Sequence, residues 1–343
     1  MTGLGAMRYS GGMIRLCWAC MLVVASIGVP VALVGCDRDE PAEPAPAATQ
    51  QHLERRHAAA LDHLDKGNFR AAIEMARQTL EDFPDDAVSH SIIARALMAM
   101  GEFEQAYEHA RRSLAIDDAQ PQMHLLVGRL AQRYATHAEA LAHYQRAMHL
   151  DRADHRYPQS IAAVALAMGE LDVAEQHARR STERESTQCR GDGLLAEVAA
   201  GRGQIDRADE LMEQAIANAD DRSHAEKYLV MRVRILREGG EATAGRALRL
   251  VGGLEPDELI SRPALLRELA RTMQALGQHE QAAMTWGLRA RRYGDACAAA
   301  EAAAAYHAGG YDQQARQWLD EARKLQAWDP RVQEVAEMID GGS

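Results

Sequence analysis

Large apolar residues and small residues recur along this chain at a fixed interval of 34 positions. The first recurring position carries large, mostly apolar side chains. The second, three residues after the first, carries alanine, and the third, two residues before the first, carries a turn residue. Their members are, in that order, Phe69, Phe103, His137, Leu171 and Ile205; Ala72, Ala106, Ala140, Ala174 and Ala208; and Gly67, Gly101, Ala135, Gly169 and Gly203. A period of this length indicates stacked helical hairpins, each too small to bury its own apolar face alone.

A polar sequence follows the same period. His109-Ala-Arg-Arg-Ser113 recurs at His177–Ser181, 68 positions later, which is twice 34. Glu108 precedes Arg112 by four residues and Glu175 precedes Arg179 by four, the orientation that favours ion pairs on a helix surface. We therefore expect the alanine and serine of this sequence to pack inward and its arginines to lie mainly on the outer surface.

The best-preserved units are GNFRAAIEMARQTLEDFPDD and GEFEQAYEHARRSLAIDD. In them a glycine supplies the turn, an aromatic residue and an alanine begin the second helix, and small residues such as Ala72 and, elsewhere, Gly128 allow close helix approach. These units resemble the tetratricopeptide repeat family, and the resemblance covers residues 53 to about 330. It implies an all-α fold, an α-solenoid of about eight helical hairpins forming a right-handed superhelix.

The period predicts the domain organisation. Five regular units occupy residues 53–222, and a degenerate unit with a longer first helix occupies 223–262. Its glycines make it a candidate hinge, because each glycine within a helix costs about 1 kcal/mol relative to alanine. Residues 263–343 are expected to hold the C-terminal units and a tail.

The N-terminal residues have the layout of an export signal. Arg8 and Arg15 precede the uncharged run Leu16–Val34, and Gly35 and Cys36 follow it. The ending resembles a bacterial lipobox, which implies a lipoprotein signal peptide over 1–35, lipidation of Cys36 and a Pro/Ala-rich tether over 36–52. Asp37 weakly favours the inner membrane. A transmembrane anchor is the alternative, since 19 apolar residues can span a bilayer.

Composition narrows the class of protein. Only 5% of the residues are aromatic and 47% are hydrophobic, which favours an all-α fold packed through small residues. The net charge of −11 argues against a nucleic-acid partner, because phosphate binding requires a basic surface. Cys17 and Cys20 lie inside the apolar run and do not indicate a redox site. Cys189 and Cys297 fall about three repeats apart, so we expect no disulfide between them.

The sequence contains no motif of a known catalytic or cofactor site. His109, His143 and His177 recur at one repeat position. Equivalent positions in neighbouring hairpins are separated by roughly 10 Å, which is too far for shared metal ligation. We predict no catalytic residue, no cofactor and no metal, and we expect these histidines to face solvent.

The resemblance places the binding surface on the first helices, which line the concave groove of this family. Transferring that register places Arg95, Arg129, Arg133, Arg156 and Arg190 along the groove, with Leu125 and Gln159 among them. Arginine's forked donors suit carboxylate groups, so the expected partners are proteins with acidic or carboxylate-bearing segments. Internal salt bridges, for example to Glu197, are the alternative.

The sequence thus predicts a non-enzymatic scaffold, lipid-anchored and facing the periplasm of a bacterial cell envelope. Exopolysaccharide export and type IV pilus biogenesis are the leading settings, by family analogy. The alternative is a regulatory subunit or enzyme of cell-wall metabolism whose site lies in residues 223–343.

Overall fold

The computed structural model describes residues 47–183 and 188–341. Within these ranges the chain forms eighteen α-helices and no strand, so the prediction of an all-α fold is confirmed. The helices of the five regular units are α1 (Ala47–Asp65), α2 (Phe69–Asp82), α3 (Ala87–Met100), α4 (Phe103–Ile116), α5 (Pro121–Arg133), α6 (His137–Leu150), α7 (Arg156–Met168), α8 (Leu171–Thr182), α9 (Gln188–Gly201) and α10 (Ile205–Ala217).

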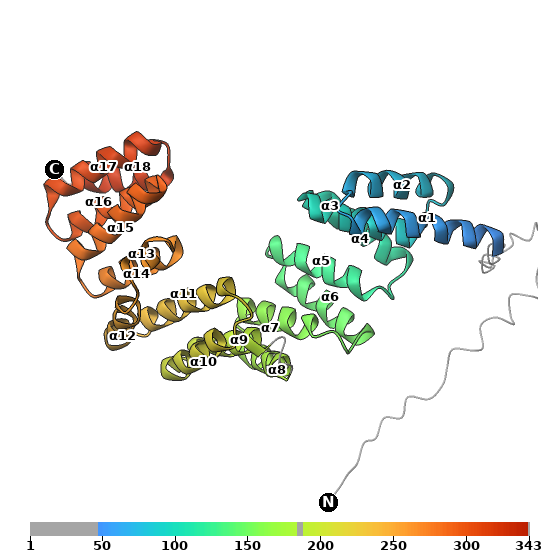
Figure 1. The fold of residues 1–343 in the computed structure, drawn as a ribbon, viewed down its shortest axis with the longest axis horizontal. Helices are drawn as coiled ribbons and strands as arrows, with labels where there is room; N and C mark the ends of the chain where they lie inside the picture. The colour runs from blue at the N-terminus through green and yellow to red at the C-terminus, as the bar shows by residue number, and fades with distance from the viewer. Residues whose placement is uncertain (1–46, 184–187, 342–343) are drawn as a thin grey trace, which may run out of the picture. The chain divides into compact units, whose positions relative to one another are not determined.

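The C-terminal helices follow the same plan with one addition. They are α11 (Arg222–Glu238), α12 (Glu241–Gly252), α13 (Pro256–Ile260), α14 (Pro263–Ala275), α15 (His279–Tyr293), α16 (Ala296–Ala308), α17 (Asp312–Gln326) and α18 (Pro330–Asp340). Consecutive helices pack into hairpins α1/α2 through α11/α12, then α14/α15 and α16/α17 (Figure 1). The eight hairpins of the described chain confirm the predicted α-solenoid, while α13 is a short insertion and α18 packs on the last hairpin.

The turn inside each hairpin requires a left-handed backbone. The predicted turn residues all have positive φ, and Ala135, with φ of 58°, is the one non-glycine residue of the described chain in that region. Gly240 and Gly277 occupy the corresponding turns of the sixth and seventh hairpins. They follow Gly203 and each other at intervals of 37, so the period lengthens after the fifth hairpin.

Helix starts are fixed by local chemistry. Asp86, Asp221 and Asp295 each accept a hydrogen bond from the backbone N–H three residues later, at 2.7 to 2.9 Å, which satisfies a donor that the helix itself leaves free. Proline begins α5, α14 and α18, where its missing N–H costs nothing. α1 begins at Ala47, inside the segment assigned to the tether, in a run of Ala, Thr and Gln that contains no proline.

The apolar core continues from one hairpin to the next, as the repeat pattern predicts. One cluster extends from Ala60 of α1 to Leu130 of α5, and the C-terminal cluster extends from Ala270 of α14 to Ile339 of α18. Close helix approach depends on small residues at particular positions. A Cβ at Gly128 would lie 2.5 Å from Cε1 of the fully buried Tyr144, so only glycine fits there.

The predicted export signal, Cys36 and Asp37 lie outside the described residues. No helix within 47–183 or 188–341 has the length and hydrophobicity needed to cross a bilayer.

Candidate functional site

The first helices of four consecutive hairpins share a cavity of about 260 Å³. α5 contributes Arg129, α7 contributes Gln159, α9 contributes Arg190 and Glu197, and α11 contributes Lys227. We call the surface formed by these five residues the first-helix face. Arg129 and Glu197 are 68 positions apart and Arg190 and Lys227 are 37 apart, so the repeat itself brings them to one face.

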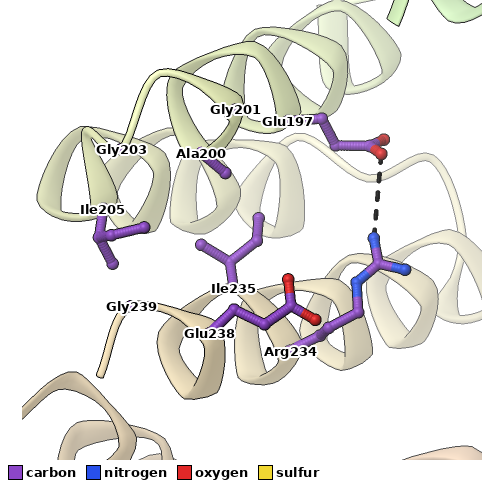
Figure 2. Close-up of a pocket in the computed structure, with 9 residues that line it drawn as sticks. All are labelled: Glu197, Ala200, Gly201, Gly203, Ile205, Arg234, Ile235, Glu238 and Gly239. Carbon is purple, nitrogen blue, oxygen red and sulfur yellow. Dashed lines mark ion pairs between the residues drawn. The ribbon is translucent and has the colours of Figure 1, made fainter. Parts of the chain in front are cut away.

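Two larger cavities adjoin this face and also contain Glu197. One, of about 620 Å³, lies along α11 as far as Ala264 of α14 and is lined by Lys227 and Arg234. The other, of about 500 Å³, lies between the ends of α9 and α11. Figure 2 shows Glu197 and Arg234 reaching toward each other across it, with Ile205 and Ile235 forming its apolar part. Glu197 is therefore the residue common to all three cavities.

The electrostatics of the first-helix face favour an anionic ligand. The 260 Å³ cavity is lined by three cationic side chains, those of Arg129, Arg190 and Lys227, and by one carboxylate, that of Glu197. Burial raises the pKa of Glu197, while the nearby charges of Arg234 and Lys227 oppose the shift. The guanidinium of Arg234 is 3.9 Å from the Glu197 carboxylate, so this ion pair is loose and leaves donors on Arg234 for another acceptor.

The structure brings together two of the five arginines that the sequence analysis assigned to the groove, Arg129 and Arg190. The other three have separate partners. Arg95 lies 3.9 Å from Asp65, the guanidinium of Arg133 lies 3.9 Å from the ring centroid of Phe103, and Arg156 pairs with Asp154 at 2.5 Å.

The two neutral residues that the sequence analysis placed among these arginines, Leu125 and Gln159, lie in different surroundings. Gln159 lines the cavity, whereas Leu125 is buried in the core. The alternative of internal salt bridging describes Arg156, because this residue pairs with Asp154 and also contacts Gln122 at 3.0 Å.

Sequence reasoning missed the basic residues on α11, because the register of the five regular units does not continue past residue 222. Lys227 and Arg234 occupy the positions that correspond to Arg190 and Glu197 once three residues are added to the period. The signal was present in the sequence: Gly203, Gly240 and Gly277 mark the longer interval.

A second basic cluster lies on the next hairpin. The carboxylate of Glu268 on α14 is only 3% exposed and has Arg237, Arg267 and Arg271 within 3.4 to 3.5 Å. Three cations around one buried anion leave an excess of positive charge on this part of the molecule. Arg237 also pairs with Glu238 at 3.0 Å, so Arg267 and Arg271 extend the basic character of the first helices beyond α11.

The histidines differ from expectation. His109, His143 and His177 were expected to face solvent, and that expectation was wrong: all three are half-buried, and His109 and His143 each contact a buried histidine of the first helix of their own hairpin. The partners are His90 and His124. No group of three or more potential metal ligands is found within the described ranges.

The two cysteines of the described chain, Cys189 and Cys297, are both free, with Cys189 buried and Cys297 exposed. The expectation that they form no disulfide with each other is confirmed.

Residues 223–341 contain several groups with shifted pKa values, and each shift has a structural cause. Burial raises the pKa of Tyr228. Hydrogen bonds to Glu301 and Glu334 raise the pKa of Arg331, and those to Asp206 and Asp209 raise that of Arg246. A raised pKa keeps the Tyr228 phenol protonated, which suits a hydrogen-bond donor rather than a catalytic base.

Comparisons with known proteins agree with this architecture. Residues 63–130 match a family model described as tetratricopeptide repeat. A tetratricopeptide repeat protein from Parabacteroides merdae ATCC 43184 is 12% identical with a TM-score of 0.51, over 84% of this chain and 99% of that one. At this identity the likeness shows the fold alone.

Other solved structures align less closely. MamA is 19% identical with a TM-score of 0.43, over 46% of this chain and 93% of that one. The Cut9–Hcn1 hetero-tetramer of the APC/C is 13% identical with a TM-score of 0.47, over 82% and 48%. No curated protein has a sequence match to this chain. Residues 63–130 thus match the tetratricopeptide repeat family, and the eight stacked hairpins of the described chain share the fold of a tetratricopeptide repeat protein.

Proposed function

We propose that this protein is a membrane-anchored scaffold of the bacterial cell envelope that docks acidic segments of partner proteins along its first-helix face. The observation that carries the proposal is the convergence of Arg129, Arg190 and Lys227 on one cavity, in a chain whose net charge is −11. A basic surface maintained on an acidic protein selects for anionic ligands.

The tetratricopeptide fold implies a scaffold for protein–protein interaction. Its stacked hairpins present the first helices side by side, so that a partner segment can contact several units at once. The cavities of the first-helix face are shallow and shared between hairpins, which suits an extended segment better than a small substrate.

The chemistry of the face suggests how such a segment binds. Arginine donates several hydrogen bonds in one plane and matches a carboxylate bidentately. A partner carboxylate placed between Arg129 and Arg190 would gain such bonds, and Glu197 would repel carboxylates that approach near Arg234. The face therefore favours acidic residues at one end of the segment and neutral or basic residues near Glu197.

The first experiment measures binding of a fluorescent decaglutamate peptide to the full chain by anisotropy. We expect binding that weakens with salt and falls at least tenfold in Arg129→Glu/Arg190→Glu. The control, Arg179→Glu/Arg207→Glu, makes the same change in charge on the second helices α8 and α10, where both arginines are exposed. Equal affinity in the two double variants would show that net charge alone, and not the first-helix face, attracts the peptide.

Anchoring is proposed from the sequence of residues 1–36. Lipidation of Cys36 after an export signal places the repeats on the periplasmic side, where exopolysaccharide export and type IV pilus biogenesis both require assembly factors. Labelling cells with a radioactive fatty acid tests this directly. Label is expected in the wild-type chain and not in Cys36→Ala, and undiminished label in the variant contradicts the proposal.

A further inference from the structure

Two pairs of histidines face each other inside adjacent hairpins. In the second hairpin, Nδ1 of His90 on α3 lies 3.0 Å from Nδ1 of His109 on α4. In the third, Nδ1 of His124 on α5 lies 2.9 Å from Nδ1 of His143 on α6. We call these four residues the histidine pairs.

The two pairs have the same geometry. His90 and His124 are 34 positions apart, as are His109 and His143. The ring centroids are 5.2 and 5.1 Å apart, with interplanar angles of 41° and 37°. His90 and His124 are 6% and 3% exposed, so each pair sits at the interface between the two helices of its hairpin.

Neighbouring carbonyl groups determine where the protons lie. Nε2 of His124 is 3.1 Å from the backbone oxygen of Asp118. A carbonyl oxygen only accepts, so this nitrogen carries a proton. In neutral His124 the Nδ1 atom is therefore an acceptor, and Nδ1–H of His143 donates to it. A backbone hydrogen bond at Pro84 acts on His90 in the same way, so His109 is the donor in the other pair.

Each pair can accept one proton but not two. When the first-helix histidine takes up one proton at Nδ1, the second-helix histidine can shift its own proton from Nδ1 to Nε2. One Nδ1–H and one free lone pair then remain between the rings. A second proton places two N–H groups and two positive charges against each other at about 3 Å, an arrangement that a half-buried site does not tolerate. Separation of the two helices relieves this repulsion.

We propose that the histidine pairs form an acid-sensitive lock that holds the two helices of the second and third hairpins together near neutral pH and releases them under mild acid. The lock acts locally, because stability in a repeat array depends mainly on each hairpin and its immediate neighbours. The fourth hairpin lacks the lock: Pro158 and His177 occupy the corresponding positions, and Nδ1 of His177 has no hydrogen-bond partner among the described residues.

The charged groups around the histidine pairs do not remove the repulsion between two protonated rings. His90 and His109 are near Arg77, Asp85, Asp86, Glu108 and Arg112. His124 and His143 are near Arg111, Asp118, Glu139 and Arg146. Two of the nearest carboxylates have basic partners of their own: Asp86 pairs with His57 at 2.7 Å, and Asp118 pairs with Arg146 while its Oδ1 also lies 3.2 Å from Nε2 of His124. The cations Arg77, Arg111 and Arg112 oppose protonation.

The pKa shifts give the pH range. Burial lowers the pKa of His90 and His143, and burial together with the charge of His90 lowers that of His109 to about 4. Histidine in an unfolded chain has a pKa of about 6.5. A lowered folded-state pKa means that the unfolded state binds more protons, so the stabilisation is present above about pH 6.5 and is lost as the pH falls toward 4.

Hydrogen exchange of the full chain at pH 7 and pH 5, corrected for the intrinsic exchange rates, tests the lock. Protection of α3 to α6 should fall at least tenfold at pH 5, the amount that corresponds to one pKa unit, while protection of α15 to α17 stays within about twofold. In His109→Gln/His143→Gln the pH effect on α3 to α6 should largely vanish, because each pair then holds one imidazole. His177→Gln is the matched control and should retain the full wild-type response.

Equal pH dependence in the wild type and in His109→Gln/His143→Gln would overturn the proposal. NMR titration of the imidazole protons in the wild-type chain provides a test that needs no variant. Each pair should titrate in two separated steps, with the second below the ordinary histidine range. Four independent titrations near pH 6.5 would likewise exclude the lock.

Discussion

One repeat position at the junctions between hairpins is apolar in the first three units and charged in the next two. At this position the first three units carry Ile73, Tyr107 and Leu141, which pack in the core. The same position carries Glu175 in the fourth unit and Asp209 in the fifth. Glu175 pairs with Arg202 at 2.5 Å, and Asp209 pairs with Arg232 of α11 and Arg246 of α12.

The change in repeat length comes one unit after this difference begins: Gly203 follows Gly169 by 34 positions, and Gly240 follows Gly203 by 37. Apolar junctions need short side chains in van der Waals contact, which holds successive hairpins in one strict register. Arginine side chains are longer and reach across a wider gap. The interval grows from 34 to 37 where arginines bridge the fifth and sixth hairpins, so this ion-paired junction accommodates the longer unit.

Replacing Asp209 tests the importance of the charged junction and should have the largest effect. Its side chain is 10% exposed and it contacts arginines from two different helices. Asp209→Ala leaves Arg232, which is 15% exposed, without its buried partner. Removing one partner of a buried ion pair costs about 3 kcal/mol or more. We expect a loss of this size in urea unfolding, with exchange protection lost first in α10 to α12.

Glu213→Ala is the control for this prediction. Glu213 pairs with the same Arg232 at 2.9 Å, but its side chain is 69% exposed. An exposed partner contributes about 0 to 1 kcal/mol. Equal losses in Asp209→Ala and Glu213→Ala would mean that burial of the pair does not set its contribution.

Close packing against glycine compares a regular hairpin with a C-terminal one and should have an intermediate effect. In Gly128→Ala the new methyl group would lie 2.5 Å from the ring of Tyr144, which is fully buried and cannot move away. In Gly287→Ala it would lie 2.4 Å from Trp318, which is only partly buried. Overpacking costs about 1 to 3 kcal/mol, and alanine recovers about 1 kcal/mol of helix propensity.

Thermal unfolding of the two alanine variants measures this contrast. We expect Gly128→Ala to lose up to about 2 kcal/mol net and Gly287→Ala to lose less, because Trp318 can rotate toward solvent. Equal losses would indicate that Trp318 is held as firmly as Tyr144, and that the C-terminal hairpins are packed as tightly as the regular ones.

The fold was largely predictable because the repeat is carried by individual residues. Gly67 and Gly101 mark turns, and Ala72 and Ala106 mark buried helix positions, so a 34-residue period assigns both helices of each regular unit. The insertion of α13 was not predicted, because its five residues, Pro256–Ile260, have no periodic counterpart.

The candidate site was predictable only where the register held. Arg129 and Arg190 were found because they lie in the regular units. Lys227 and Arg234 were missed because three added residues shift the phase. The histidine pairs were missed for another reason: a contact between His90 and His109 depends on how two helices face each other, and a one-dimensional period does not encode that geometry.

Arginine–aromatic contacts give the smallest predicted effect and compare the same interaction in both regions. The guanidinium of Arg133 lies 3.9 Å from the ring centroid of Phe103, whereas that of Arg291 lies 4.9 Å from the ring of Trp318. Exposed contacts of this kind contribute about 0.5 to 1 kcal/mol and weaken with distance. Arg133→Gln should therefore lower the free energy of unfolding by about 0.5 kcal/mol, and Arg291→Gln by less. Because Arg133 points to Phe103 and not into the first-helix face, Arg133→Gln should also leave decaglutamate binding unchanged, and weakened binding would mean that the basic face extends further along α5 than the cavity indicates.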